Sequence, residues 1–99
     1  MRYEIERTAD FDLWLKKLWD RQAVLAINKR LTRIAVGNFG DCKEISEGVF
    51  ELRFFIGPGY RVYFTIRAGT IVLLLCGGDK SSQEADIKRA VNMARTMED

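Results

Sequence analysis

The chain has 99 residues, of which 47% are hydrophobic and 30% are charged, with a net charge of +2. This is the size and composition of one folded domain, so we expect a single domain over residues 1–99. Histidine is absent, and the only cysteines are Cys42 and Cys76. The composition therefore excludes a Ser-His-Asp triad and argues against a metal site, a bound cofactor or a disulfide framework.

The N-terminal residues are charged rather than signal-like, and no apolar run approaches 18 residues. We therefore expect a cytoplasmic protein with reduced thiols and no membrane association.

Two amphipathic helices are predicted in the first half of the chain, after a short strand with alternating residues near Tyr3–Arg7. Thr8 is the predicted cap of the first helix, which breaks near Asp20. The apolar stripe of this helix comprises Phe11, Trp14, Leu15, Leu18 and Trp19. The stripe of the second helix, which stops at Gly37-Asn38, comprises Val24, Ile27, Leu31, Ile34 and Ala35. Consecutive amphipathic helices of this kind predict a helical hairpin packed on a sheet.

A weak strand over 41–46 and two stronger strands over 49–56 and 60–67 follow. Gly57-Pro58-Gly59 reads as a three-residue turn, and pairing Ile56 with Tyr60 places Arg53 opposite Tyr63. The predicted core face carries Phe50, Leu52, Phe54, Val62, Phe64 and Ile66. The opposite face, which we expect to be open to solvent, carries Glu51, Arg53, Phe55, Arg61, Tyr63 and Thr65.

The apolar run over 71–76 predicts an interior strand that ends at Gly77-Gly78. The pattern Ser81-x-x-Glu84 is typical of a capping box at the start of a final helix, whose stripe comprises Ile87, Ala90, Val91 and Ala94. The sequence therefore predicts an α+β domain of order β-α-α-β-β-β-β-α. Its sheet is mostly antiparallel, with an N-terminal helical hairpin and a C-terminal helix.

The candidate functional side chains lie on or beside the predicted open face. Arg53 and Arg61 offer planar cationic forks that match phosphate oxygens. Tyr60 and Tyr63 are able to stack on a base or to handle a proton. The alternative is structural: the arginines pair with Glu51 or stay solvated, and the tyrosines pack. A cysteine nucleophile is disfavoured, because no histidine is present to activate either thiol.

Two segments, GDCKEISEGVFELRFFIGPGYRVYF and IVLLLCGGDKSSQEADIKRA, resemble the HigB-type addiction-module killer branch of the RelE/ParE toxin superfamily. The helical stretch WLKKLWDRQAVLAINKRLTRI fits as well, so the resemblance covers nearly the whole chain. It implies a small fold of the predicted order and a toxin that cuts messenger RNA on the ribosome. It also implies an antitoxin from the same operon that silences the toxin.

The resemblance assigns roles to individual residues. Arg53 and Arg61 are expected to bind the phosphate during metal-independent attack by a ribose 2′-hydroxyl, with Lys80 as a further cation. Tyr63 is expected to stack on a base or assist proton transfer. Additional RNA contacts are expected from Tyr60 and Lys43.

The sequence departs from the best-known nucleases of the superfamily at three points. Glu51 stands where they can have a strand lysine, Asp86 stands where they can have a catalytic tyrosine, and there is no histidine. ParE-type relatives inhibit DNA gyrase, so a gyrase inhibitor and an inactive binding domain remain alternatives. The expected antitoxin is a separate helix-turn-helix protein. It would cover either the basic face or the first two helices, whose basic residues are Lys16, Lys17, Lys29, Arg30 and Arg33.

Overall fold

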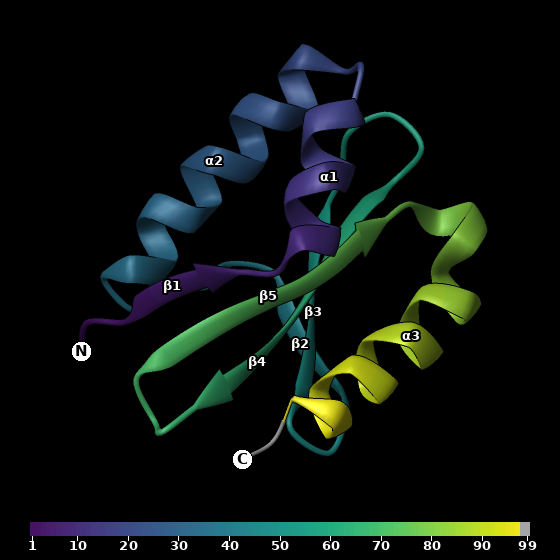
Figure 1. Ribbon diagram of the computed structural model, residues 1–99. Coiled ribbons are helices and arrows are strands. Elements are labelled where there is room, and N and C mark those ends of the chain that lie inside the picture. Colours follow the sequence, from purple (N-terminus) through teal and green to yellow (C-terminus); the bar gives the residue numbers. More distant parts are fainter. Residues whose placement is uncertain (98–99) are drawn as a thin grey trace.

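The computed structural model, which describes residues 1–97, has the predicted order of strands and helices (Figure 1). The elements are β1 (Glu4–Arg7), α1 (Ala9–Lys17), α2 (Arg21–Ala35), β2 (Cys42–Ser46), β3 (Val49–Phe54), β4 (Tyr60–Arg67), β5 (Ile71–Gly78), the 3-10 helix η1 (Lys80–Ser82) and α3 (Gln83–Thr96). The α+β prediction is therefore confirmed. Within residues 1–97, no helix is both long and apolar enough to span a membrane.

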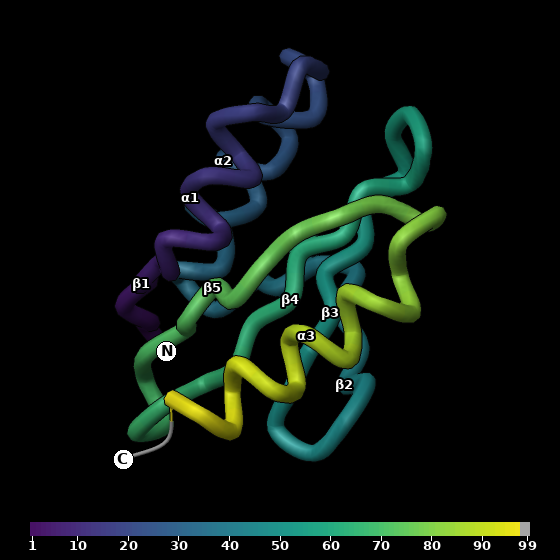
Figure 2. The backbone as a smooth tube through the Cα atoms, turned by 45° about the vertical axis from the view of Figure 1, so that its right-hand side comes forward, coloured from purple at the N-terminus to yellow at the C-terminus, as the bar shows by residue number. Residues whose placement is uncertain are grey.

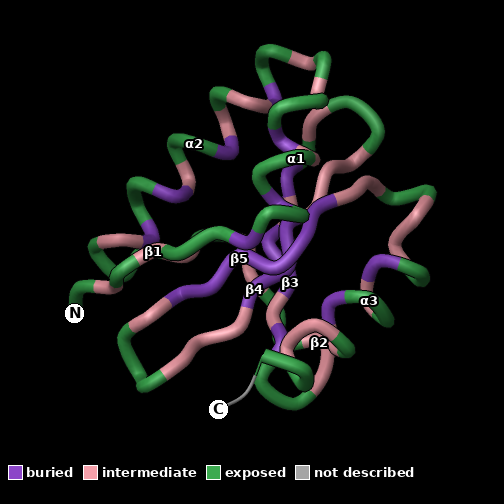
Figure 3. The backbone as a smooth tube through the Cα atoms, viewed as in Figure 1, coloured by how far each residue is buried: buried purple, intermediate pink, exposed green. Residues whose placement is uncertain are grey.

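The strands form one five-stranded sheet in the order β1-β5-β4-β3-β2. β1 runs parallel to β5, and the other pairs are antiparallel. α1 and α2 lie side by side over one face of the sheet, whereas α3 lies over the other face (Figures 1 and 2). The interior position of β5, predicted from its apolar run, is confirmed by the burial of Val72 through Gly77 (Figure 3).

The main core lies between the helical hairpin and the sheet. Thr8 caps α1 as predicted, since its Oγ1 accepts a hydrogen bond of 3.0 Å from the Phe11 amide. The same hydroxyl donates to the Leu75 carbonyl, which joins the start of α1 to β5. The fully buried side chains of this core are Phe11, Ile27, Ile34, Leu52, Val62, Phe64, Val72 and Leu74. They come from both predicted helix stripes and from the predicted core face of the strands.

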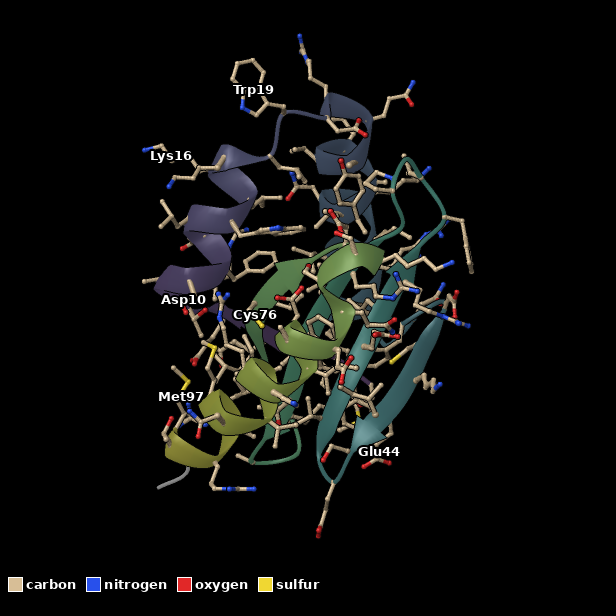
Figure 4. All side chains as sticks on the ribbon, turned by 90° about the vertical axis from the view of Figure 1, so that its right-hand side faces the viewer. Asp10, Lys16, Trp19, Glu44, Cys76 and Met97 are labelled. Atoms are coloured by element: carbon tan, nitrogen blue, oxygen red, sulfur yellow. The ribbon has the colours of Figure 1, made fainter. Side chains whose placement is uncertain are left out.

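Trp19 was predicted to belong to this core, and that prediction is wrong. The side chain is 95% exposed at the tip of the helical hairpin (Figure 4). α1 ends at Lys17, two residues earlier, so the helical spacing that placed Trp19 on the stripe no longer applies. Trp14, still inside the helix, does pack against the core.

Gly77 lies directly beneath Trp14, and the contact leaves no room for a side chain. A Cβ at position 77 would overlap the indole ring. We expect Gly77→Ala to lower the free energy of unfolding by about 1–3 kcal/mol through overpacking. Urea titration tests this, with Gly69→Ala as the control. Gly69 has no neighbour within 4 Å but a φ of +72°, so strain alone should cost that variant about 1 kcal/mol. A Gly77 variant no less stable than the Gly69 variant contradicts the packing.

The register predicted for the β3–β4 hairpin is wrong by two residues. Phe54 pairs with Tyr60 and Arg53 with Arg61, so the connecting loop runs over 55–59 instead of 57–59. The cause is a turn in which the Gly59 amide donates to the Ile56 carbonyl at 3.1 Å. Gly57 and Gly59 both take positive φ there, which glycine adopts without a steric penalty. A two-residue shift keeps every side chain on its predicted face.

The face predicted to be open is instead largely covered by α3. A second buried cluster forms between this helix and the sheet, from Val49, Tyr63, Leu73, Leu75, Cys76 and Ala90. A bulge in β5 supports the cluster: Cys76 pairs with Tyr63 and Leu74 with Phe64, so Leu75 is the extra residue. The prediction was wrong because the polar residues at 51 and 53 are typical of a solvent-exposed face. The apolar stripe of α3 must also be buried, and it packs against this face.

The predicted capping box at Ser81 is also wrong by two residues. The Asp79 side chain accepts a hydrogen bond of 2.8 Å from the Ser81 amide, and the Asp79 amide donates to the Ser82 hydroxyl at 3.4 Å. The cap thus starts the 3-10 turn that precedes α3. Hydrogen bonds from Ser81 lower the pKa of the Asp79 carboxyl.

Candidate functional site

Three of the predicted site residues lie at the end of the sheet beside the loop over 55–59. Arg53 and Arg61 are cross-strand partners, and Gly78 pairs with Arg61 on its other side. A Cβ built on Gly59 would lie 3.4 Å from both Arg61 Nη1 and Lys80 Cβ. The Lys80 amide also donates to the Pro58 carbonyl at 3.4 Å. We call Arg53, Arg61 and Lys80 the cation cluster.

Arg61 forms an ion pair with the buried carboxylate of Glu51. Its Nε lies 3.5 Å from Glu51 Oε2, and the two side chains are 13% and 2% exposed. Gln83 Nε2 donates to the same Glu51 oxygen at 2.9 Å, so α3 contributes to the arrangement. Arg61 Nη1 donates to the Gly59 carbonyl at 2.9 Å. These contacts fix the guanidinium, and Nη2 makes no hydrogen bond within residues 1–97.

The other two cations of the cluster differ in their partners. Arg53 forms an ion pair with Asp41, with distances to Oδ1 of 3.1 Å from Nη2 and 3.3 Å from Nε. Its guanidinium carbon also lies 5.7 Å from the centroid of the Phe55 ring. Lys80 is exposed and, among the residues that the structure describes, has no acidic partner. Lys80 is therefore the most accessible cation of the cluster, and an anion at this point would compete with Asp41 for Arg53.

The two candidate tyrosines lie in different places: Tyr63 pairs with Glu51 in the sheet, close to Arg61, and Tyr60 lies on the opposite face. Tyr63 is fully buried, and its hydroxyl has no hydrogen-bond partner within residues 1–97. Burial, with an addition from the Glu51 charge, raises the pKa of Tyr63. Tyr60 lies on the helical face, with its ring 6.4 Å from Trp14 and its hydroxyl 3.5 Å from Asp20. The predicted stacking of Tyr63 on a base is wrong, because its ring is fully buried, whereas an RNA contact from the half-buried Tyr60 stays a prediction.

Tyr63→Phe should leave the protein as stable as the wild type or more stable, because the hydroxyl is buried without a hydrogen bond. Burial of such a group costs about 1–3 kcal/mol. Since the folded-state pKa is raised, the unfolded state loses its proton first, near pH 10, and stability falls as pH rises above that value. The variant should lose less stability between about pH 8 and about pH 10.5 in urea titrations. An equal loss in both proteins contradicts the burial of Tyr63.

Lys43 and the cysteines occupy separate positions. Lys43 is exposed on β2. Its cross-strand partner is Glu51, which lies two residues before Arg53 on β3. Cys76 is buried under α3, and burial raises its pKa to about 11 (Figure 4). A thiol in this state is a poor nucleophile near neutral pH.

Sequence reasoning missed several residues that shape the site. The structural alternative, in which an arginine pairs with Glu51, is what the structure shows for Arg61. The burial of this ion pair was not predicted. Asp41 was missed because it lies outside the hairpin; the β2–β3 register places it beside Arg53. Asp86 is 8% exposed and accepts a 2.5 Å hydrogen bond from Ser82. A Cβ on Gly78 would overlap Asp86, so this carboxylate packs directly on the strand end.

Residues 14–98 match the family model described as phage-derived protein Gp49-like (DUF891). The chain belongs to this Gp49-like family. An uncharacterized protein of Haemophilus influenzae is 48% identical over 97 residues, which span 98% of each chain.

Solved structures similar to this Gp49-like protein include toxins. A mutant of the Escherichia coli toxin RelE in the free state aligns with a TM-score of 0.74 and 16% identity, covering 93% of this chain and 97% of the toxin. The RelBE2 toxin–antitoxin complex of Mycobacterium tuberculosis aligns with a TM-score of 0.64 and 20% identity, covering 81% of this chain and 100% of the matched chain. The fold is therefore that of RelE toxins, which is the fold that the resemblance to the RelE/ParE superfamily implies.

Proposed function

We propose that this Gp49-like protein is the toxin of a type II toxin–antitoxin system, of the HigB type, and that it cleaves messenger RNA on the ribosome. The observation that carries the proposal is the cation cluster, which brings Arg53, Arg61 and Lys80 to one end of a RelE-like sheet. The fold alone does not define an activity. The cluster supports this one because it matches the charge of a phosphodiester.

The proposed reaction depends on protein cations that stabilise developing negative charge, and it uses no metal ion. The RNA 2′-hydroxyl attacks the adjacent phosphorus, and the bond from phosphorus to the 5′ oxygen breaks. The products are a 2′,3′-cyclic phosphate and a 5′-hydroxyl; one proton leaves the attacking oxygen and one is delivered to the departing oxygen. Arg61 and Lys80 stabilise the negative charge that builds up on the phosphoryl oxygens. The ribosome holds the strand in a reactive geometry, which offsets the absence of histidine.

The first test is induction of the protein in growing cells. A rapid halt of protein synthesis with cleaved messages is the expected result. DNA damage with filamentation would instead indicate a gyrase inhibitor, and normal growth would indicate an inactive binding domain.

We also propose that an adjacent gene encodes a helix-turn-helix antitoxin. Two of the solved structures with this fold are toxin–antitoxin complexes: RelBE2, and an Escherichia coli RelE mutant bound to a RelB peptide. In the second, the RelE chain aligns with a TM-score of 0.66 and 13% identity, covering 89% of this chain and 94% of the toxin. Lys16, labelled in Figure 4, and its neighbour Lys17 are exposed on α1 and offer one surface for acidic side chains. Co-expression of the neighbouring gene should restore growth and give a co-purifying complex. If no neighbouring product binds or rescues, the toxin–antitoxin proposal fails.

A further inference from the structure

An open groove lies between α2 and the end of β3, outside the cation cluster. We call it the α2 groove; its walls include Lys29 and Arg33 on one side and Phe55 and Ile56 on the other. Its volume is about 200 Å³. Small-molecule pockets are larger, at roughly 300–1,000 Å³. The α2 groove is therefore suited to one part of a longer ligand that continues beyond it.

The helix that forms one wall is basic, and most of its positive charge lies near its C-terminal end. α2 carries Arg21, Lys29, Arg30 and Arg33 and no acidic residue. Lys29 and Arg33 are exposed and form no salt bridge within residues 1–97. Negative charge on a ligand would meet no carboxylate from this helix.

Arg30 has a structural role, contrary to its expected place on an exposed basic surface. Its guanidinium lies 4.4 Å from the Phe54 ring centroid. It donates to the carbonyls of Phe39, Asp41 and Arg53 at 3.4, 3.3 and 3.0 Å. Arg30 therefore fixes the floor of the α2 groove against the strand that carries Arg53.

Phe55 connects the α2 groove to the cation cluster. The side chain is 82% exposed, although it is a large apolar residue. Its ring faces the Arg53 guanidinium at 5.7 Å and also lines the groove with Lys29 and Arg33. An exposed aromatic ring between groups of cations is the arrangement that binds single-stranded nucleic acid, since bases stack on the ring and phosphates meet the cations.

We propose that single-stranded RNA follows a track from the cation cluster across Phe55 into the α2 groove. A base stacks on Phe55, and the neighbouring phosphates contact Lys29 and Arg33. This inference deepens the proposed function, because it assigns the binding of the RNA flanking the scissile phosphate. An acidic protein segment is a weaker candidate for the same place, since it would leave the exposed ring without a stacking partner.

The test measures binding of a fluorescein-labelled single-stranded RNA of about 12 nucleotides to the purified protein without ribosomes. Phe55→Ala should weaken binding by about 10-fold, from the loss of one stacked base. Lys29→Ala/Arg33→Ala should reduce the slope of log affinity against log salt by about 1.4, the loss of two single-strand phosphate contacts. The matched control is Lys88→Ala/Arg95→Ala, which removes the same two charges from exposed positions on α3. It should leave affinity and slope unchanged.

Two results would overturn the track. One is an equal loss of affinity in the groove and control variants. The other is wild-type RNA affinity in groove variants that no longer bind the antitoxin, which would make the groove a protein contact. Cleavage of translated message by the wild type is measured separately. If the wild type cleaves but the groove variants bind RNA as tightly as the control variant, only the proposed RNA track is wrong. If the groove variants bind RNA weakly but the wild type does not cleave, only the nuclease proposal is wrong.

Discussion

Arg61→Lys is expected to reduce message cleavage by 100-fold or more while leaving the protein folded. Lysine keeps a positive charge near Glu51, but it lacks the planar fork with which Arg61 donates to the Gly59 carbonyl and still has a second terminal nitrogen that can donate to phosphate. Loss of one donor to transition-state charge typically costs about 100- to 1,000-fold in rate. The measurements are growth after induction and primer extension on cellular messages.

Arg95→Lys provides the matched control, since Arg95 is an exposed arginine on α3. It should remain fully toxic. Thermal unfolding of both variants separates loss of chemistry from loss of fold. Arg61→Ala is a poorer test of the chemistry, because it would leave the buried Glu51 without its cation and could destabilise the fold. The predicted open face had suggested that this variant would stay folded. Full toxicity of Arg61→Lys in a folded protein would show that the cation cluster is not the active site.

Glu51→Ala is expected to lower the free energy of unfolding by about 3–5 kcal/mol, which is typical when one partner of a buried ion pair is removed. The variant leaves the mostly buried Arg61 without a carboxylate and the Gln83 amide without its acceptor. Urea titration measures the loss. Glu47→Ala, at an exposed turn position, is the control and should change stability by less than about 0.5 kcal/mol.

The double variant Glu51→Ala/Arg61→Ala makes this prediction sharper. It should be less destabilised than the sum of the two single variants, because no unpaired buried charge remains. Additive losses, or a Glu51→Ala variant as stable as Glu47→Ala, would show that the buried pair does not hold the site together.

The parts of the fold that follow from local periodicity could be predicted from the sequence. Thr8 as a cap, the buried stripe of α2 and the apolar run of β5 depend on residues close together in the chain, and all are present. Trp19 and the hairpin register depend on where a helix or turn stops. Two glycines with positive φ lengthened the loop, and no alternation pattern reveals that.

The candidate site was predictable only in part. Arg53, Arg61 and Lys80 could be named because each is a polar residue on or just after an otherwise apolar strand. The roles of Tyr63 and Glu51 depend on α3 folding back over the sheet, a long-range contact that strand patterns do not encode. Phe55 was placed on a strand face, whereas the longer loop turns it outward beside Arg53 and the α2 groove.

The central claim is tested most directly by adding the purified protein to a reconstituted translation system and mapping the message ends. The account predicts cleavage of the translated message with 2′,3′-cyclic phosphate ends, little cleavage of the same RNA without ribosomes, and at least about 100-fold slower cleavage by Arg61→Lys. An intact translated message, at protein concentrations that stop growth in cells, would contradict it.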